Sequence, residues 1–150
     1  MRTKAILSAS IFIIFAAFMA HAHEKTYTIA QQATMCTKLP MSADGIIRLS
    51  KVEVDPVYLD EYMKFAIEVG EISLRREPGV LTMYALQEKD NPCNITILEM
   101  YASQEAYRSH IASAHFQKYK QGTLHMVKNL QLLDQTELNP SNKIVNYIED

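Results

Sequence analysis

His110 and His115 are the residues whose type and spacing first suggest chemistry in this chain. They lie in residues 95–119, where an alternating apolar strand pattern leads into a helical pattern that begins at Ser103. Imidazole is the side chain that changes charge nearest neutral pH, so either histidine could transfer a proton. A structural role is the alternative, because a histidine near a helix end can bond the last carbonyl groups. The residues alone leave both roles open.

Aromatic side chains around the same segment are candidates for the walls of a pocket. Glu99 and Tyr101 should meet the same neighbours, because strand side chains alternate with a period of two. Tyrosine would give such a pocket apolar surface together with a hydrogen-bonding hydroxyl. Aromatic residues can equally form the core, and Glu99 can equally form an ordinary ion pair. The substrate-binding candidates are Tyr101, Glu99, Tyr62, Tyr84 and Phe116.

Sequence motifs for metals, nucleotides and hydrolytic nucleophiles do not occur. The chain has no GxGxxG, Walker loop, GxSxG, HExxH or paired CxxC pattern. His110 and His115 are five residues apart, so on one continuous helix they would not share a face as i, i+4 ligands do. No acidic residue accompanies them on the same helical face. We therefore expect no metal site.

Cys36 and Cys93 are the two cysteines of the chain. An even number in an exported protein favours a disulfide, which would join the segment before the domain to the loop at residues 90–94. The alternative is a reactive or metal-binding pair of thiols. Neither cysteine has a second cysteine or a histidine at ligand spacing, so we expect a bridge rather than a metal site.

Residues 1–22 have the pattern of a cleavable signal peptide. Arg2 and Lys4 precede an apolar run over residues 5–19, and Ala20-His21-Ala22 offers a small-x-small cleavage site. An uncleaved anchor is the alternative, but the run is short for a membrane span. Cleavage removes two of the 15 Lys and Arg and none of the 17 Asp and Glu, so the formal charge moves from -2 to -4. We expect a periplasmic or secreted protein with no membrane contact after cleavage and no nucleic-acid partner.

The rest of the chain indicates an extension at residues 23–44, one domain at 45–138 and a tail at 139–150. Strand patterns cover residues 46–54, 80–87, 95–101 and 130–138. A helix should follow Asp55-Pro56 and end at Glu77-Pro78-Gly79. A second helix should run from Ser103 to about Val127, with a break near Gly122.

This element order, βαββαβ, predicts an α+β, ferredoxin-like split βαβ fold. Two helices should cover one face of a four-stranded antiparallel sheet. The other face carries apolar residues and has to be buried. A second copy of the chain is the usual solution, so we expect a homodimer.

Several short motifs suggest a family. They are Glu99-Met100-Tyr101, Ala106, His110 and Ala114-His115-Phe116, together with Glu77-Pro78-Gly79-Val80 before the second strand. With the element order, they resemble the antibiotic biosynthesis monooxygenase (ABM) domain family over residues 45–138. The family includes quinol monooxygenases and is diverse in function, so the resemblance alone does not fix a reaction.

The resemblance implies a dimeric α/β-barrel assembly and a cofactor-free oxygenase. A quinol-like or phenolic small aromatic would be deprotonated, and its anion would react with oxygen. His115 and His110 would act as base or donor, with Tyr101 shaping the cavity. His115 is the stronger candidate because it belongs to the His-Phe signature.

Two other functions compete with this one. One is a non-catalytic dimeric protein that binds a small hydrophobic ligand. The other is heme degradation, which is disfavoured. Ile47 takes the first-strand position at which heme-degrading relatives have asparagine, and Lys120 and Gln121 stand where those relatives have the heme-ligating histidine.

Overall fold

The computed structural model describes residues 35–139. The expected signal peptide, the first part of the extension and nearly all of the tail lie outside the described residues. The elements are β1 (Ile46–Val54), the 3-10 helix η1 (Pro56–Tyr58), α2 (Leu59–Arg76), β2 (Val80–Gln87), β3 (Asn94–Tyr101), α3 (Gln104–Ala112), α4 (Ala114–Thr123) and β4 (Val127–Asp134).

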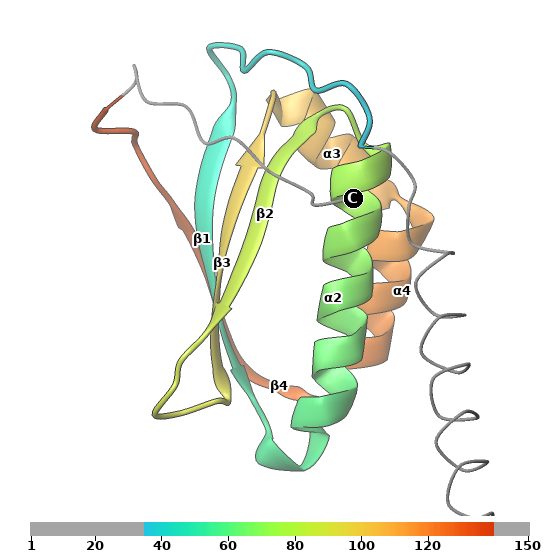
Figure 1. Ribbon diagram of the computed structural model, residues 1–150, viewed down its shortest axis with the longest axis vertical. Helices are drawn as coiled ribbons and strands as arrows, with labels where there is room; N and C mark the ends of the chain where they lie inside the picture. The colour runs from blue at the N-terminus through green and yellow to red at the C-terminus, as the bar shows by residue number, and fades with distance from the viewer. Residues whose placement is uncertain (1–34, 140–150) are drawn as a thin grey trace, which may run out of the picture. The chain divides into compact units, whose positions relative to one another are not determined.

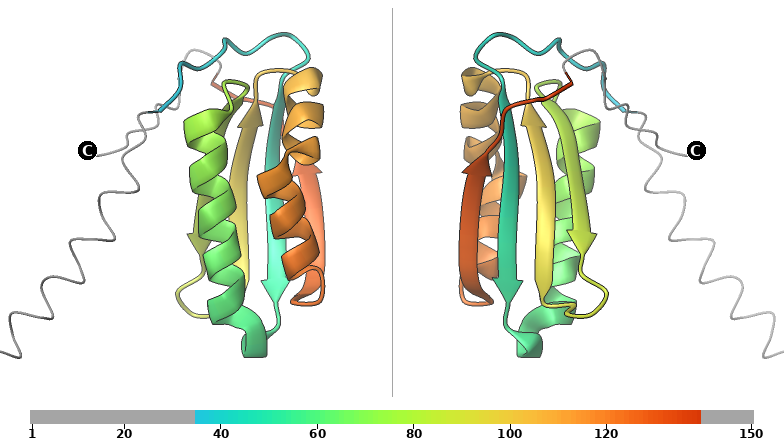
Figure 2. Two further views of the ribbon diagram at one scale, coloured as in Figure 1. Left: turned by 90° about the vertical axis from the view of Figure 1, so that its right-hand side faces the viewer. Right: turned by 90° about the vertical axis from the view of Figure 1, so that its left-hand side faces the viewer.

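The four strands form one antiparallel sheet in the order β2-β3-β1-β4. All the helices lie on one face of this sheet (Figures 1 and 2), which confirms the ferredoxin-like fold. We call the face under the helices the inner face. The register pairs Ile46 with Tyr101 at one end of β1 and Val52 with Ile95 toward the other. Within residues 35–139, no helix is both long and apolar enough to cross a membrane.

Two apolar clusters fill the inner layer, one toward each end of the sheet. The first contains Ile46, Val80 and Tyr101. The second contains Val52, Val54, Tyr62, Ile95 and Met126. Both clusters consist of inward-facing strand residues capped by aromatic or aliphatic side chains of the helices, as the alternation of the strands requires.

The second helical segment breaks at Ser113, which the sequence did not predict, and it ends at Thr123, close to the break predicted near Gly122 and before the predicted end at about Val127. The Ser113 backbone is extended (φ -65°, ψ 149°), its N–H donates to the carbonyl of His110, and its Oγ accepts from the N–H of Phe116. Ser113 therefore ends α3 and caps α4, as serine commonly does. Gly122 lies inside α4, where a Cβ atom would come 2.6 Å from Cε1 of Phe65.

The last strand is Val127–Asp134, which begins and ends earlier than the predicted residues 130–138. Val127 pairs with Val54 beyond an irregularity at residues 53 and 54 of β1, so pairing starts as soon as the chain leaves α4. The strand ends at Asp134, which accepts a 2.6 Å hydrogen bond from Nε of Arg48. Beyond Asp134, the N–H of Gln135 still donates to the carbonyl of Ile47 in β1 at 2.8 Å, and residues 136–138 belong to no strand.

Both cysteines are free, and the predicted Cys36–Cys93 bridge is not formed. The N–H of Cys36 donates to the carbonyl of Arg75, at the C-terminal end of α2. The carbonyl of Cys93 accepts from Val54 at the far end of β1. The two thiols thus sit at opposite ends of the sheet, far beyond the reach of a disulfide. Sequence spacing carries no information on that separation.

Candidate functional site

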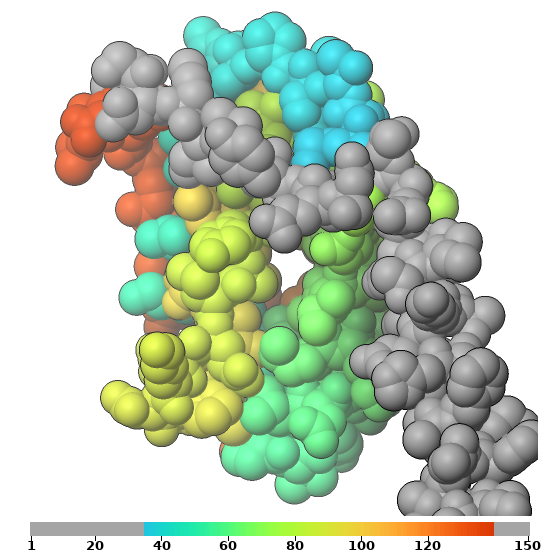
Figure 3. All heavy atoms as spheres, viewed as in Figure 1, coloured from blue at the N-terminus to red at the C-terminus, as the bar shows by residue number. Residues whose placement is uncertain are grey.

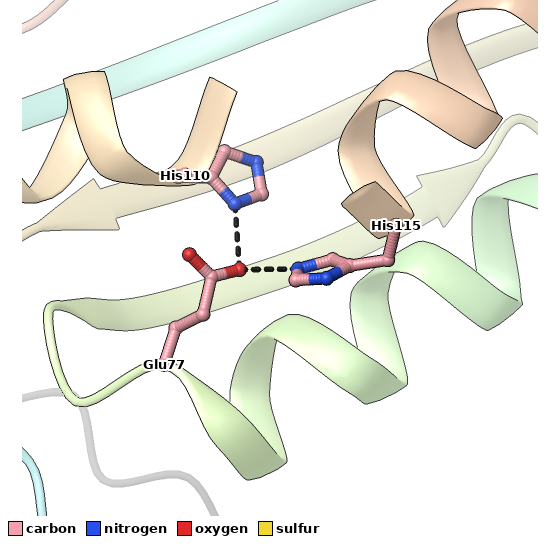
Figure 4. Close-up of side chains that lie close together, drawn as sticks. All are labelled: Glu77, His110 and His115. Carbon is pink, nitrogen blue, oxygen red and sulfur yellow. Dashed lines mark hydrogen bonds and ion pairs between the residues drawn. The ribbon is translucent and has the colours of Figure 1, made fainter. Parts of the chain in front are cut away.

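Glu77, His110 and His115 meet at one end of the inner layer (Figure 4), and we call them the histidine cluster. Oε1 of Glu77 lies 2.9 Å from Nδ1 of His110 and 2.6 Å from Nε2 of His115. The three side chains come from three elements: the residue after α2, the last turn of α3 and the first turn of α4. The break at Ser113 makes this convergence possible, because one continuous helix would direct the two imidazoles differently.

The charge of Glu77 fixes the roles of the two imidazoles. Burial acts to raise the pKa of Glu77, but the hydrogen bonds from His110 and His115 outweigh it, so this pKa lies below its ordinary value. A carboxylate only accepts hydrogen bonds, so Nδ1 of His110 and Nε2 of His115 both carry protons. In neutral His110, the other ring nitrogen, Nε2, then holds a free lone pair. Glu77 acts as a positioning residue that sets this tautomer.

A cavity of about 510 Å³ lies between the helices and the inner face of the sheet. Figure 3 shows the molecule hollowed between β2 and α2. Both elements contribute to the cavity wall, β2 with Met83 and α2 with Val69. Most of the wall is apolar, and it includes Val69, Met83, Ile97, Tyr107, Phe116 and Tyr119. Its size and character suit a small, largely hydrophobic organic molecule.

His110 links the histidine cluster to this cavity. Its side chain is 1% exposed, and it belongs to the cavity wall. Its ring lies 4.9 Å from that of Phe116 and 5.4 Å from that of Tyr101, measured between ring centroids. Among the described residues, Nε2 of His110 makes no hydrogen bond, and it is not one of the enclosed atoms that lack a partner, so it borders the open space of the cavity. The arrangement is a base oriented by a carboxylate, with its free nitrogen available to a molecule in the cavity.

The polar groups of the cavity wall differ in their protonation and in their hydrogen bonds. The hydroxyl of Tyr101 donates to Oε2 of Glu99 at 2.7 Å. Burial, followed by the charge of Glu99, raises the pKa of Tyr101, so the phenol stays protonated. Arg48 bonds Asp134 and lies over the ring of Tyr107. Ser50 is different, because within residues 35–139 its Oγ is the one buried side-chain oxygen or nitrogen without a partner.

Some of the predicted site residues line the cavity and others do not. His110, Glu99, Tyr101 and Phe116 line it. His115 does not: it meets the cavity wall only through Glu77 and its contact with the His110 ring.

Two of the predicted tyrosines also lie elsewhere. Tyr62 is fully buried beside the cavity and shares a 2.8 Å hydrogen bond with Tyr119. Tyr84 is 61% exposed and pairs with Leu98, so it lies on the outer face of the sheet, away from the cavity.

Sequence reasoning missed Glu77 and Ser50 as site residues. Glu77 precedes a helix-ending Pro-Gly, where a glutamate needs no explanation beyond the turn. Its partners stand 33 and 38 residues further along the chain. Ser50 gives no local signal at all, because only the cavity reveals that its hydroxyl is unpaired.

The absence of a nearby acidic ligand, assumed from the sequence, is also corrected. Glu77, His110 and His115 each offer one ligand atom, and these atoms lie within 4.8 Å of one another. A single helix over residues 103–127 would offer the two histidines no carboxylate on their own face. The third group comes instead from the end of α2.

The family model described as antibiotic biosynthesis monooxygenase matches residues 45–122. This range contains the whole histidine cluster and all of the sheet except β4. No curated protein matches the chain significantly.

Solved structures give a close relative and more distant ones. A protein of Bacteroides thetaiotaomicron VPI-5482 named "Putative antibiotic biosynthesis monooxygenase" is 50% identical, with a TM-score of 0.66, over 68% of this chain and 97% of its own. A Lactobacillus acidophilus NCFM protein named "putative monooxygenase" is 29% identical, with a TM-score of 0.60, over 67% of this chain and 47% of its own. A Nitrosomonas europaea protein, 18% identical with a TM-score of 0.60 over 68% of this chain and 98% of its own, shares the fold.

Proposed function

The chain belongs to the antibiotic biosynthesis monooxygenase family, and we propose that it oxidises a quinol-like or phenolic small aromatic with molecular oxygen. The observation that carries the proposal is the pair of Glu77 and His110 at the wall of the cavity. It supplies an oriented base inside an apolar space of suitable size. The reaction would need no bound cofactor, because an electron-rich aromatic anion can itself reduce oxygen.

Proton transfer to His110 begins the reaction. A hydroxyl of the substrate lies against the free Nε2 of His110 and gives up its proton, while Glu77 stabilises the imidazolium through the Nδ1–H bond. His115 holds Glu77 from the other side at 2.6 Å, and it has no direct contact with the substrate. This division of roles differs from the one that the sequence suggested, in which His115 was the stronger base candidate.

The overall reaction balances without another reductant. A quinol and one oxygen molecule give a hydroxyquinone and one water molecule, and all the electrons come from the substrate. One oxygen atom enters the ring and the other leaves as water. The apolar wall keeps bulk water from the anion, which favours its reaction with oxygen over reprotonation.

Ser50 and Glu99 are the groups that we assign to substrate placement. Leaving a buried hydroxyl unpaired is costly, so Ser50 gains a hydrogen bond when a substrate oxygen enters. Glu99 already accepts from Tyr101 and can accept from a second hydroxyl of the substrate. Most of the remaining wall is apolar.

We also propose that the protein is exported and acts as a homodimer. The outer face of the sheet carries Tyr84, Leu86 and Leu133, which are well exposed in the single chain. Burial of such a face against a second copy would remove it from water. Size-exclusion chromatography with light scattering would test this, and Leu133→Glu should shift a dimer to a monomer.

Oxygen uptake with a panel of hydroquinones tests the enzymatic proposal. We expect saturable uptake, and we expect His110→Gln to lower kcat about 10²- to 10⁴-fold, the usual contribution of a general base. His125→Gln is the matched control, because His125 packs on Tyr58 away from the cavity wall. Saturable binding of the same aromatics without oxygen uptake would instead support the alternative, a non-catalytic ligand-binding protein.

A further inference from the structure

The histidine cluster has one group more than an oriented base requires. A carboxylate on Nδ1 of His110 is sufficient to hold its ring and tautomer. Yet a second imidazole, from a different helix, approaches the same Oε1 atom of Glu77 at 2.6 Å. Two imidazole nitrogens and one carboxylate oxygen from three elements are the ligand set of several zinc sites.

We propose that Glu77, His110 and His115 bind a divalent transition metal ion of the zinc type. The ligand atoms would be Oε1 of Glu77, Nδ1 of His110 and Nε2 of His115, which lie within 4.8 Å of one another. With zinc-ligand bonds of about 2.0–2.2 Å, tetrahedral ligands stand about 3.3 Å apart. The oxygen–nitrogen distances of 2.9 and 2.6 Å need to open by less than about 1 Å, and the two nitrogens, which lie within 4.8 Å, need to close by at most about 1.5 Å; side-chain rotation provides both.

Charge and access both suit a cation. The carboxylate with two neutral imidazoles carries one negative charge, and the ion would replace the protons that they now share. The side chains of Glu77 and His115 are 16% and 19% exposed, which leaves a path for the ion and for water as a fourth ligand. Ser113, whose Oγ lies 3.1 Å from Nε2 of His115, adds a nearby oxygen.

This inference does not rest on the proposed oxygenase, and the two have opposite consequences for His110. A metal on Nδ1 takes the place of the proton there, which moves to Nε2, and His110 then can no longer accept one from a substrate. Filling the site should therefore lower oxygen uptake in proportion to the metal bound, with recovery on chelation. If oxygen uptake instead required the metal, His110 could not be the general base, but the metal site itself would be supported.

Cobalt titration of the chelator-treated full chain tests the site directly. We expect one Co²⁺ per chain, the intense visible d–d bands of four- or five-coordination, and displacement by Zn²⁺. His115→Gln and Glu77→Gln should each weaken binding about 100-fold or more. His125→Gln should leave it unchanged, since His125 lies outside the cluster.

Three results would overturn the site. One is a fully folded wild-type chain that takes up no Co²⁺. Another is Co²⁺ binding of equal strength in His115→Gln and wild type, which would place the ion elsewhere on the chain. The last is a sulfur-to-cobalt charge-transfer band, which would assign the ion to Cys36 or Cys93. Circular dichroism of each variant separates loss of ligand from loss of fold.

Discussion

Two polar groupings lie in the inner layer, toward opposite ends of the sheet. We call Tyr62 and Tyr119 the tyrosine pair; its hydroxyls bond each other at 2.8 Å, next to the larger apolar cluster. In the histidine cluster the hydrogen bonds converge on one oxygen of Glu77, and Nε2 of His110 is left over. Both groupings contain side chains that can transfer protons. Only the second leaves a basic nitrogen free at the cavity wall.

The difference between the two groupings distinguishes a polar contact that only stabilises the fold from one that can take part in proton transfer. A hydroxyl pair in which each oxygen has the other as partner costs little to bury and offers a ligand no basic atom. An imidazole that is held on one nitrogen and free on the other is both fixed and reactive. The comparison predicts that substitutions in the histidine cluster change turnover more than stability. Substitutions in the tyrosine pair should do the reverse.

After the loss of the base itself in His110→Gln, Glu77→Gln should give the largest effect. Gln keeps the shape of Glu77 and can still accept through its amide oxygen, but it lacks the charge that stabilises the imidazolium. We expect kcat to fall about 100-fold, equivalent to about 2.7 kcal/mol, with a melting temperature close to that of the wild type. Oxygen uptake and thermal unfolding on the same samples measure both quantities. An unchanged kcat would remove Glu77 from the mechanism.

The sequence predicted the fold well because its signals are local. The strands at residues 46–54 and 80–87 have alternating apolar residues, and Asp55-Pro56 and Ser103 supply caps that the structure contains. The sequence did not predict the break at Ser113, because a serine inside a helical pattern can also face solvent. Gly122 correctly marked the end of the helix, since α4 ends at Thr123, and its lack of a side chain also allows the close approach of Phe65.

The site was less predictable because its partners are distant in sequence. His110 and Tyr101 could be named from their types, and both line the cavity. The carboxylate of Glu77 reaches the histidines only after the chain has crossed two strands and a helix. Tyr84 was assigned to the pocket because alternation alone does not say which face of a strand is the inner one.

Gly79→Ala and Gly122→Ala test how tightly the chain is packed at the two ends of the inner layer, since each adds a Cβ atom where another residue lies close. At Gly79, next to the histidine cluster, a Cβ atom would lie 2.5 Å from Cβ of Ala106, so β2 and α3 must move apart. We expect a loss of about 2 kcal/mol in the free energy of unfolding, as for other overpacked sites.

At Gly122, near the tyrosine pair, the clash is with the ring of Phe65, which can rotate. Alanine also favours the helix by about 1 kcal/mol over glycine. Denaturant unfolding of both variants should show the larger loss for Gly79→Ala. Equal losses would mean that the two ends are packed alike.

Alkaline pH should weaken the protein through the tyrosine pair. Burial raises the pKa values of Tyr62 and Tyr119 above the ordinary value of about 10. The folded state then holds protons that the unfolded state releases, so stability is complete below about pH 10 and falls as pH rises above it. Each phenol contributes a loss of about 1.4 kcal/mol per pH unit.

Unfolding in denaturant between about pH 9 and 12, on either side of the ordinary tyrosine pKa, measures this slope. Tyr62→Phe should make it shallower by the contribution of one group. Tyr84→Phe is the matched control, because it removes a phenol from the exposed outer face. A slope that stays the same in Tyr62→Phe would show that this phenol already ionises in the folded protein.

Tyr62→Phe at neutral pH should give the smallest effect. It tests whether the tyrosine pair contributes to stability and not to turnover. The substitution removes one hydroxyl from a fully buried side chain and leaves the ring in place. The hydroxyl of Tyr119 loses its partner, which we expect to cost about 1 kcal/mol, while kcat stays within about twofold. Tyr119→Phe and the double variant complete a cycle that isolates the hydrogen bond from the separate cost of each unpaired hydroxyl. If Tyr62→Phe lowered kcat as far as Glu77→Gln does, the tyrosine pair would belong to the proton-transfer machinery, and the division between the two ends would fail.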